Sequence, residues 1–322
     1  MKLGIIGCGG IAHKFAQACQ IVGGIELVVA ARDADKAADF AKQYNATAHY
    51  GGYQAMLDNE QLDGVYIALT HNFHYDWIVA CLNKRIPVLC EKPMVLTEKE
   101  AAALFDLAKA QDTLLVEAIW TKMHAGFLLV KDWLHSGRIG KLSLIETNFG
   151  NHVPYDPANR FYNPELAGGA MYDLGVYNIQ FTCGLLDSQP LAITGYAHIG
   201  ETGVDEQAVL NMQFADGVMA TANFTFHCQT HREASIYGDK GYMRIGQFYQ
   251  TQTVTLYDKA GTQLERWETP QDNGFVYQVE HFVDLLRTRA KESPLATPAG
   301  TIGCANIFDQ LNQQWGIKIN NA

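Results

Sequence analysis

Short apolar runs alternate with segments of helical spacing along the first part of the chain. The apolar runs occupy residues 3–6, 25–31, 64–69, 87–90 and 113–118, and the helical patterns occupy 12–22, 35–44, 74–83 and the stretch that begins at 97. Nearly unbroken apolar strands separated by helices are typical of a parallel sheet that is covered on both faces. The pattern therefore predicts a doubly wound α/β arrangement.

The pattern changes beyond residue 120. Helical spacing at 124–136, 275–290 and 302–314 accompanies longer strands of alternating apolar and polar residues at 142–149, 207–214, 218–226 and 253–257. Asp216-Gly217 between two of these strands is a hairpin signal. Successive strands without intervening helices predict a mostly antiparallel sheet with one open face. We expect a first domain at residues 1–119 and a second, α+β domain at 120–322.

Composition and charge narrow the class of protein. Apolar residues make up 48% of the chain, which excludes a disordered or coiled-coil protein. Asp and Glu outnumber Lys and Arg by 34 to 24, and the net charge of -10 argues against a nucleic-acid or anionic-membrane surface. The seven cysteines form no Cys-x-x-Cys pair, and no apolar run approaches the ~20 residues of a spanning helix. Since no cleavable leader is evident, we predict a cytoplasmic protein that binds neither nucleic acid nor membrane.

A glycine cluster follows the first predicted strand and opens the first predicted helix. Residues 7–12 read Gly-Cys-Gly-Gly-Ile-Ala and fit the pattern G-x-G-x-x-A. Gly7 permits the tight turn, Gly9 lets backbone amides approach a pyrophosphate, and Ala12 permits close helix packing. The amino end of the helix adds unsatisfied N–H groups with partial positive charge. We interpret the cluster as a Rossmann dinucleotide site rather than an ordinary tight turn.

The end of the second predicted strand bears on the choice of cofactor. Arg32 stands where a guanidinium can pair with the 2′-phosphate of NADP, whereas Asp33 can accept a hydrogen bond from the ribose 2′-hydroxyl of NAD. Asp33 or Asp35 can also cap the helix that follows. We favour NADP and keep NAD as the alternative.

Two further loops follow strands of the predicted parallel sheet, where such sheets bind ligands. Thr70, Asn72 and His74 are expected to line the nicotinamide ribose. Lys92 follows the next strand, where its charge can lower the pKa of a nearby acid and stabilise an alkoxide. The bond from Lys92 to Pro93 is a candidate cis peptide.

Two groups of histidines raise the question of a metal. His71 and His74 lie three residues apart, and His227, Cys228 and His231 follow a predicted strand. The sequence identifies no further ligand for either group, whereas structural zinc sites have four. We therefore predict no metal.

The motifs, taken in order, resemble those of the glucose–fructose oxidoreductase/inositol dehydrogenase family, the Gfo/Idh/MocA-type oxidoreductases. The resemblance spans essentially the whole chain and rests on the glycine cluster, on residues 70–74 (Thr-His-Asn-Phe-His), on 90–93 (Cys-Glu-Lys-Pro) and on 168–177 (Gly-Gly-Ala-Met-Tyr-Asp-Leu-Gly-Val-Tyr). Residues 117–121 (Glu-Ala-Ile-Trp-Thr) and the tyrosine at 177 resemble the dimeric dihydrodiol dehydrogenase/D-xylose dehydrogenase branch. Lys122, Met123 and His124 stand where that branch usually has an arginine and two phenylalanines, a departure that bears on the substrate pocket.

The resemblance implies an N-terminal Rossmann domain and a C-terminal domain on an open, mostly antiparallel sheet. It also implies that Lys92, Asp173 and Tyr177 carry the chemistry. A tyrosine with its ordinary pKa of ~10 is a poor base near neutrality, and an adjacent lysine cation lowers that pKa. Asp173 lies four residues before Tyr177, so one helical turn would place both on one face. Whether Tyr177 or Lys92 is the acid/base stays open.

The candidate binding residues divide between the two predicted domains. The expected cofactor-binding residues are Gly7, Gly9, Gly10, Ile11, Ala12, Arg32, Thr70, Asn72, His74, Glu91 and Lys92. The candidate substrate residues are Trp120, His124, Phe149, His152, Tyr155, Arg160, Phe161 and Tyr162. The polar side chains of His152 and Arg160 can hydrogen-bond to hydroxyl groups and favour a polyhydroxylated substrate. The aromatic side chains can pack against either the face of a sugar or an aromatic ring.

We predict an NADP-dependent enzyme that transfers a hydride between a nicotinamide and a CH–OH group of a sugar, polyol or trans-dihydrodiol. The alternatives are an NAD-dependent inositol or sugar dehydrogenase and a non-catalytic, dinucleotide-binding redox sensor. Met212, Phe214, Phe224 and Phe226 lie on strands of the open sheet and favour a homodimer or homotetramer through that face, unless they face the domain's own helices.

Overall fold

The computed structural model describes residues 1–269 and 272–318, and these residues group into two compact units. Unit 1 comprises residues 1–95, 99–120 and 272–298. Unit 2 comprises residues 96–98 together with the described parts of 121–271 and 299–322. A late segment of the chain, 272–298, therefore belongs to the same compact unit as the amino-terminal residues. The domain division between residues 119 and 120 stays a prediction.

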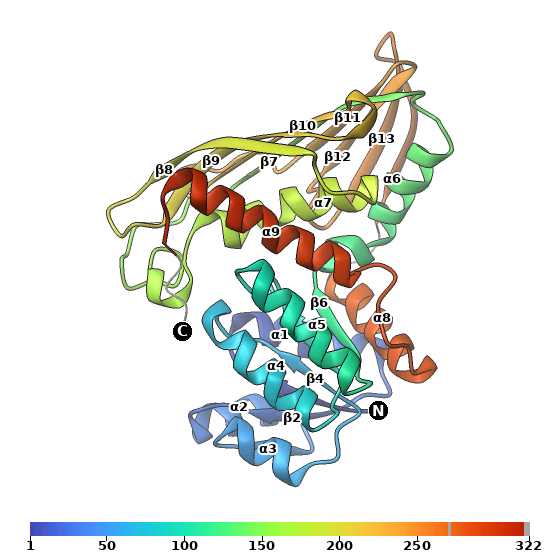
Figure 1. Ribbon diagram of the computed structural model, residues 1–322. Helices are drawn as coiled ribbons and strands as arrows, with labels where there is room; N and C mark the ends of the chain where they lie inside the picture. The colour runs from blue at the N-terminus through green and yellow to red at the C-terminus, as the bar shows by residue number, and fades with distance from the viewer. Residues whose placement is uncertain (270–271, 319–322) are drawn as a thin grey trace. The chain divides into compact units, whose positions relative to one another are not determined.

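Unit 1 is built on a six-stranded parallel sheet in the order β3-β2-β1-β4-β5-β6 (Figure 1). The strands are β1 (Lys2–Ile6), β2 (Glu26–Ala30), β3 (Ala48–Tyr50), β4 (Gly64–Ile67), β5 (Val88–Glu91) and β6 (Leu115–Ala118). The helices are α1 (Gly10–Val22), α2 (Ala34–Tyr44), α3 (Tyr53–Asn59), α4 (His74–Asn83), α5 (Glu98–Ala110) and α8 (Phe275–Thr288), with 3₁₀ turns η1 (His71–Phe73) and η2 (Trp120–Met123). The order is that of a doubly wound Rossmann sheet, whose ligands bind beyond the strand carboxyl ends.

Local sequence explains several of these elements. Every residue of β4 and β5 is buried, as expected for inner strands covered on both faces. Asp33 caps α2, because its Oδ1 accepts hydrogen bonds from the N–H groups of Asp35 and Lys36. Helix α8 packs on α1, and the Phe282 ring lies so close to Gly64 that a Cβ there would stand 2.9 Å from it.

Unit 2 carries an eight-stranded sheet in the order β14-β13-β12-β11-β7-β10-β9-β8. The strands are β7 (Leu142–Gly150), β8 (Ala192–Ile199), β9 (Asp205–Gln213), β10 (Met219–Thr225), β11 (Ala234–Gly238), β12 (Gly241–Gly246), β13 (Thr253–Asp258) and β14 (Gln263–Glu268). The helices are α6 (Ala125–His135), α7 (Val176–Leu186) and α9 (Pro298–Trp315), with shorter turns η3 (Pro164–Leu166), η4 (Met171–Gly175) and η5 (Ala215–Gly217). All neighbouring strands are antiparallel except β7 and β10, so the predicted α/β plus α+β fold class is confirmed.

The predicted hairpin at Asp216-Gly217 joins β9 to β10. Both residues have positive φ, 58° and 77°, and the Val218 N–H donates to the Ala215 carbonyl at 3.3 Å. This is the conformation of a type I′ turn, whose twist matches that of paired antiparallel strands.

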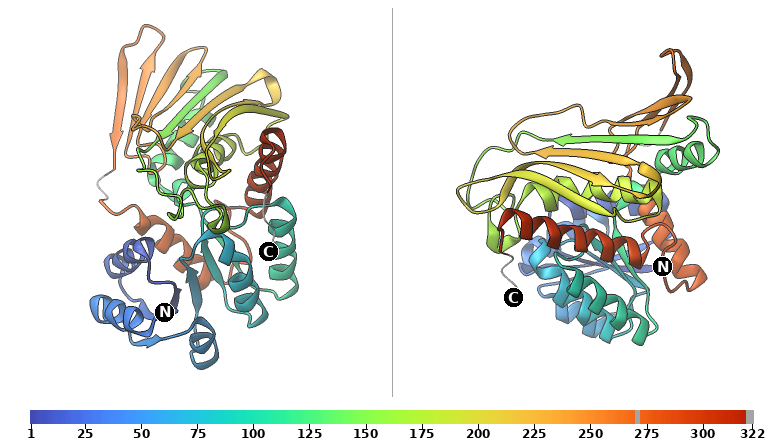
Figure 2. Two further views of the ribbon diagram at one scale, coloured as in Figure 1. Left: turned by 90° about the vertical axis from the view of Figure 1, so that its left-hand side faces the viewer. Right: turned by 45° about the horizontal axis from the view of Figure 1, so that its top comes forward.

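One face of the unit 2 sheet is covered and the other is open. Helices α6 and α7 pack on β13, β7 and β10, and Trp315 of α9 donates a hydrogen bond to the Gly195 carbonyl of β8. Figure 2 shows these three helices on one side of the sheet, with no α-helix from the described residues of unit 2 on the other. From Glu206 onward, buried and exposed side chains alternate along β9.

The residues expected to make the open face apolar lie on the covered face instead. Met212, Phe214, Phe224 and Phe226 are at most 2% exposed, and the Phe224 ring packs against Gly175 of η4. The prediction that these four side chains form an exposed surface is therefore wrong, because they are buried within their own unit, Phe224 against η4 and Phe226 against Phe161 and Tyr162. The open face carries other apolar side chains, namely Tyr196, Val209 and Met219, which are 89%, 47% and 43% exposed.

Candidate active site

The glycine turn between β1 and α1 has the backbone that a bound dinucleotide requires. Gly7 has φ 97°, and a Cβ there would stand 2.7 Å from the Ala68 carbonyl oxygen, so only glycine fits. At Gly9 and Gly10 no described atom lies within 4 Å of an added Cβ. The first turn of α1 carries no acidic side chain and no side-chain cap among the described residues. The amino end of α1 therefore leaves space beside Gly9 and Gly10 and carries no competing acidic group, which fits a pyrophosphate.

Arg32 lies exposed just beyond β2. Its guanidinium stands 5.9 Å from the centre of the Phe73 ring. It also interacts with Tyr53, whose pKa is raised by burial and lowered in part by the Arg32 charge. The neighbouring Asp33 uses one carboxylate oxygen to cap α2. One carboxylate oxygen of Asp33 is thus used within the chain, whereas Arg32 lies exposed beside Phe73 and Tyr53.

The Thr70–His74 loop joins β4 to α4. Thr70 Oγ1 donates to Asn72 Oδ1 at 2.8 Å, so these two predicted cofactor residues support each other. His74 is fully buried, with Nδ1 3.0 Å from the Pro93 carbonyl and Nε2 3.2 Å from the Leu69 carbonyl. Burial lowers its pKa. Both ring nitrogens of His74 are thus directed at backbone oxygens, which tie the loop after β4 to the loop after β5.

Lys92 lies in a loop that buried polar groups hold in place. Tyr66 on β4 donates a 2.5 Å hydrogen bond to Glu91 Oε1, and Glu91 Oε2 accepts from the Lys92 N–H at 3.3 Å. The Met94 N–H donates to Glu117 Oε1 at 3.0 Å. The Lys92–Pro93 peptide is cis, as the sequence suggested. The half-buried Lys92 side chain therefore leaves a backbone that is fixed on both sides.

Glu91 also makes hydrogen bonds within unit 1. The sequence marks Glu91 as a cofactor-binding residue, and in the structure its buried carboxylate accepts hydrogen bonds from Tyr66 and from the Lys92 N–H. Its contribution to the site is to position Lys92. Direct contact between Glu91 and the cofactor stays a prediction.

In unit 2, Asp173 and Tyr177 lie where a π-helical turn runs into α7. The π turn η4 spans Met171–Gly175, and the α-helix continues from Val176. Arg160, a predicted substrate residue, donates a 3.1 Å hydrogen bond from its guanidinium to Asp173 Oδ1, and the two charges form an ion pair. π turns inside helices are frequent at functional sites. The structure thus brings together Arg160 and Asp173, two of the candidate residues of this unit.

The start of η4 depends on Asp205, which the sequence analysis did not single out. Asp205 Oδ2 accepts from the Met171 N–H at 2.7 Å, and a Cβ on Gly169 (φ 127°) would stand 2.5 Å from Asp205 Oδ1. Complete burial raises the pKa of Asp205 to about 7. Asp205 lies two residues before the predicted strand 207–214 and next to Glu206, so the hydrophobic pattern gives no signal for its role.

Aromatic side chains surround Tyr177. The Phe149 ring lies 5.4 Å from it and stacks on Tyr249 at 4.6 Å, while the Tyr249 ring lies 5.8 Å from Tyr177. Tyr177 is 9% exposed. Phe149 was a candidate substrate residue, whereas Tyr249 lies in an irregular segment after β12 and has no sequence signal. The aromatic environment limits water around the Tyr177 ring.

The remaining candidate substrate residues lie in several different local environments. Trp120 packs on Phe275 within unit 1, at 4.7 Å. His124 is 1% exposed, and burial lowers its pKa to about 4. Arg160 lies over the Phe161 ring at 4.0 Å. His152, Tyr155 and Tyr162 line a separate cavity of unit 2.

Comparison with known proteins agrees with this architecture. Residues 1–118 match the model of an oxidoreductase family with an NAD-binding Rossmann fold, and residues 127–244 match the GFO/IDH/MocA C-terminal domain. The chain is a two-part NAD-binding oxidoreductase, and it belongs to the Gfo/Idh/MocA family, as the motifs indicated. No helix of the described residues is long and apolar enough to cross a membrane.

Similar proteins match along nearly the whole length. Trans-1,2-dihydrobenzene-1,2-diol dehydrogenase of Mus musculus is 29% identical over 332 residues, covering 98% of this chain and 97% of its own. The protein of that name from Xenopus laevis is 28% identical over 326 residues, with 98% of each chain covered. The crystal structure of KijD10, a 3-ketoreductase from Actinomadura kijaniata in complex with NADP and TDP-benzene, superposes with a TM-score of 0.87 at 24% identity, covering 98% and 97% of the two chains.

Proposed function

We propose that the enzyme transfers a hydride between NADP and a CH–OH group of a trans-dihydrodiol, a sugar or a polyol. The observation that carries this proposal is the glycine turn, open above Gly9 and Gly10, in a family of NAD-binding oxidoreductases. The names of the curated relatives support a dihydrodiol as the first substrate to test.

Arg32 supports the choice of NADP over NAD. Its exposed guanidinium can form charge-assisted hydrogen bonds to a 2′-phosphate, and the Phe73 ring beside it restricts its motion. Asp33, the residue that would favour NAD, already caps α2. Thr70 and Asn72 are the proposed contacts for the nicotinamide ribose, and the α1 N-terminus with Ile11 and Ala12 is the proposed cradle of the pyrophosphate.

Tyr177 and Lys92 are the proposed proton-handling residues. When bound, the nicotinamide accepts or supplies the hydride. Tyr177 exchanges the proton of the substrate hydroxyl, and the Lys92 cation favours the phenolate and stabilises negative charge on the same oxygen. Which of the two is the acid/base stays open, since coupled groups titrate together.

Asp173 and the side chains near it are proposed to orient the substrate. The Arg160–Asp173 ion pair offers both a cation and an acceptor for hydroxyl groups. Phe149 offers an aromatic surface next to Tyr177, against which a ring or a sugar face can pack. Trp120, His124, His152 and Phe161 stay predicted substrate residues.

The open face of the unit 2 sheet supports a homodimer or homotetramer. Tyr196 and Val209 lie opposite each other on β8 and β9, and Met219 lies on β10 of the same face. Exposed apolar residues on a broad sheet face are typical of an interaction surface. All seven cysteines are free thiols, which supports the proposed cytoplasmic location.

A panel of trans-dihydrodiols, aldoses and polyols, assayed with NADP and NAD in parallel, tests the function. We expect turnover of at least one compound with a higher kcat/KM for NADP. Faster turnover with NAD would favour an inositol- or sugar-type NAD dehydrogenase. Tight NADPH binding without turnover of any compound would favour a redox sensor and contradict the proposal.

A further inference from the structure

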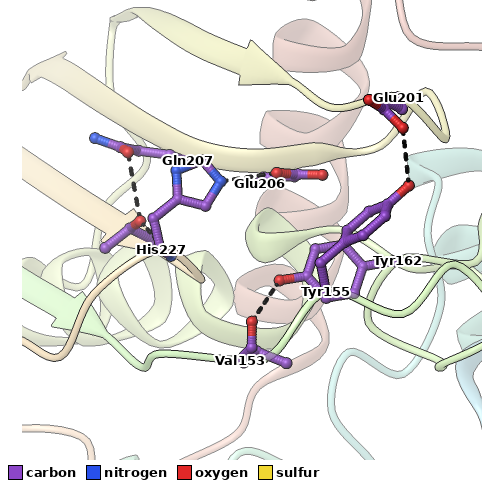
Figure 3. A network of polar contacts seen from close by, with 8 residues as sticks. Val153, Tyr155, Tyr162, Glu201, Glu206, Gln207 and His227 are labelled. Atoms are coloured by element: carbon purple, nitrogen blue, oxygen red, sulfur yellow. Dashed lines mark hydrogen bonds and ion pairs between the residues drawn. The ribbon is translucent and has the colours of Figure 1, made fainter.

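An open cavity of about 440 Å³ lies in unit 2, away from the residues assigned to hydride transfer. His198, Glu206 and His227 line it, together with His152 and Tyr155. Figure 3 shows part of this cavity, with the His227 ring directed at the Glu206 carboxylate and Tyr155 directed at Glu201. The proposed chemistry of the enzyme uses none of the three residues His198, Glu206 and His227.

The three side chains come from three separate segments. His198 lies on β8, Glu206 on β9, and His227 two residues beyond the end of β10. His227 Nε2 lies 2.7 Å from Glu206 Oε2, and the two imidazole rings are 5.4 Å apart between centres. One nitrogen of each histidine and one carboxylate oxygen of Glu206 all lie within 4.8 Å of one another.

We propose that His198, Glu206 and His227 bind a divalent transition-metal ion of the zinc type. Two imidazoles and one carboxylate form a donor set that Zn²⁺ commonly takes, with a fourth position left for water or a further ligand. That fourth position faces the cavity, where His152 also lies. The sequence predicted no metal because it identified no further ligand for His227, Cys228 and His231, and in the fold β8 and β9 supply His198 and Glu206 beside His227.

Glu206 is the fixed member of the set. It is 8% exposed, and a Cβ on Gly200 would stand 1.9 Å from Glu206 Oε1, so a glycine at 200 makes room for the carboxylate. Its Oε2 is thereby held next to the exposed His227 ring.

The histidines are the adaptable members. Ligand atoms of a tetrahedral zinc site with bonds of ~2.0–2.1 Å stand about 3.3 Å apart. His198 and His227 are both exposed, so small rotations of their side chains close the remaining distance.

The first test is calorimetric titration of the full-length protein, freed of metal by chelation, with Zn²⁺. We expect one ion per chain. His198→Ala and His227→Ala should each weaken binding by about 100-fold or more, since even residues that only support a metal ligand typically contribute 10–100-fold. His231→Ala and Cys228→Ser change neighbouring exposed side chains outside the set and should bind like the wild type.

A second measurement follows the metal directly. Co²⁺ added to the metal-free protein should give visible absorption bands of a low-symmetry site, and the bands should be absent in the His198→Ala,His227→Ala double variant. Circular dichroism of each variant checks that the fold is retained. Zn²⁺ binding that is equally strong in wild type and double variant, or absent from the wild type, would overturn the proposal.

Discussion

Tyr66 on β4 donates a 2.5 Å hydrogen bond to the buried carboxylate of Glu91 at the end of β5. The Tyr66 ring is itself fixed, because it stacks on Phe15 of α1 with ring centres 3.7 Å apart. The other carboxylate oxygen of Glu91 accepts a hydrogen bond from the Lys92 N–H, so the position of Glu91 helps to fix the backbone of Lys92. A tyrosine in the core of unit 1 therefore determines where the loop of the proposed catalytic lysine begins.

Tyr66→Phe should lower both stability and turnover. The substitution leaves a buried carboxylate without its phenol donor, which we expect to cost about 2 kcal/mol of unfolding free energy. Turnover should fall by about tenfold or more because Lys92 is displaced, while the Kd for cofactor changes little. Urea unfolding and steady-state kinetics measure the two effects.

Tyr50→Phe is the matched control. Tyr50 also donates to a carboxylate, Glu60, but that group keeps an ion pair with Lys2. We expect a loss below about 1 kcal/mol and unchanged turnover. Equal effects of the two substitutions on turnover would show that Tyr66 does not position the lysine loop.

Gly7→Ala should abolish tight cofactor binding. Both the positive φ and the clash with the Ala68 carbonyl oppose a Cβ at this turn. Gly23→Ala is the control, because Gly23 also has positive φ (75°) but no described atom within 4 Å of an added Cβ. It should lose about 1 kcal/mol of stability and bind cofactor normally. Fluorescence titration with NADPH compares them, and equal affinities would argue against a cofactor site at this turn.

Arg32→Ala should weaken binding of NADPH selectively. Losing charge-assisted hydrogen bonds to a 2′-phosphate corresponds to about 10- to 100-fold in Kd. Binding of NADH, which lacks that phosphate, should change by less than about threefold. Arg287→Ala, an exposed arginine on α8, serves as the control. A parallel loss for both cofactors would contradict the assignment of Arg32 to the 2′-phosphate.

The contribution of His124 to stability should fall as pH decreases from about 6.5 to about 4, whereas Asp205, whose pKa burial raises to about 7, acts in the opposite direction over this window. Burial lowers the pKa of His124 to about 4, below the ~6.5 of an unfolded histidine, so the unfolded state binds more protons across this window. His124 makes its full contribution to the free energy of unfolding above pH ~6.5. Protonation of the unfolded state removes about 3 kcal/mol of this contribution by pH ~4. His74 and His281 act in the same direction, because burial lowers their pKa values as well.

Thermal unfolding of the wild type and of His124→Gln at several pH values measures this dependence. The midpoint of the wild type relative to that of the variant should decrease between pH ~6.5 and ~4, because only the wild type carries the buried His124, while Asp205 contributes equally to both proteins. Identical slopes for the two proteins would show that His124 does not control acid stability.

The sequence predicted the two sheets because each has a distinct hydrophobic period. Unbroken apolar strands indicated the parallel sheet, and alternation indicated the antiparallel one. The short strand β3 (Ala48–Tyr50) and the helix α3 (Tyr53–Asn59) were not predicted, since elements of this length offer too few residues for a period to show.

The covering of the second sheet could not be predicted from periodicity. Alternation along β9 shows that two faces differ, but it does not reveal which face is covered, nor that Phe224 packs against Gly175 of η4. The motifs identified candidate residues near strand ends, but not the side chains that hold them. Tyr66, Asp205 and Tyr249 reach the site region through tertiary contacts, as do the three residues of the proposed metal site.

The most direct test of the account is the turnover of Tyr177→Phe and Lys92→Ala, measured together with their affinity for NADPH. We predict that each variant binds NADPH within about threefold of the wild type, while kcat falls by at least about 100-fold. Tyr237→Phe, on β11 and outside the candidate site, should retain wild-type turnover. Full turnover of both Tyr177→Phe and Lys92→Ala with normal cofactor binding would contradict the assignment of these residues to the hydride-transfer reaction.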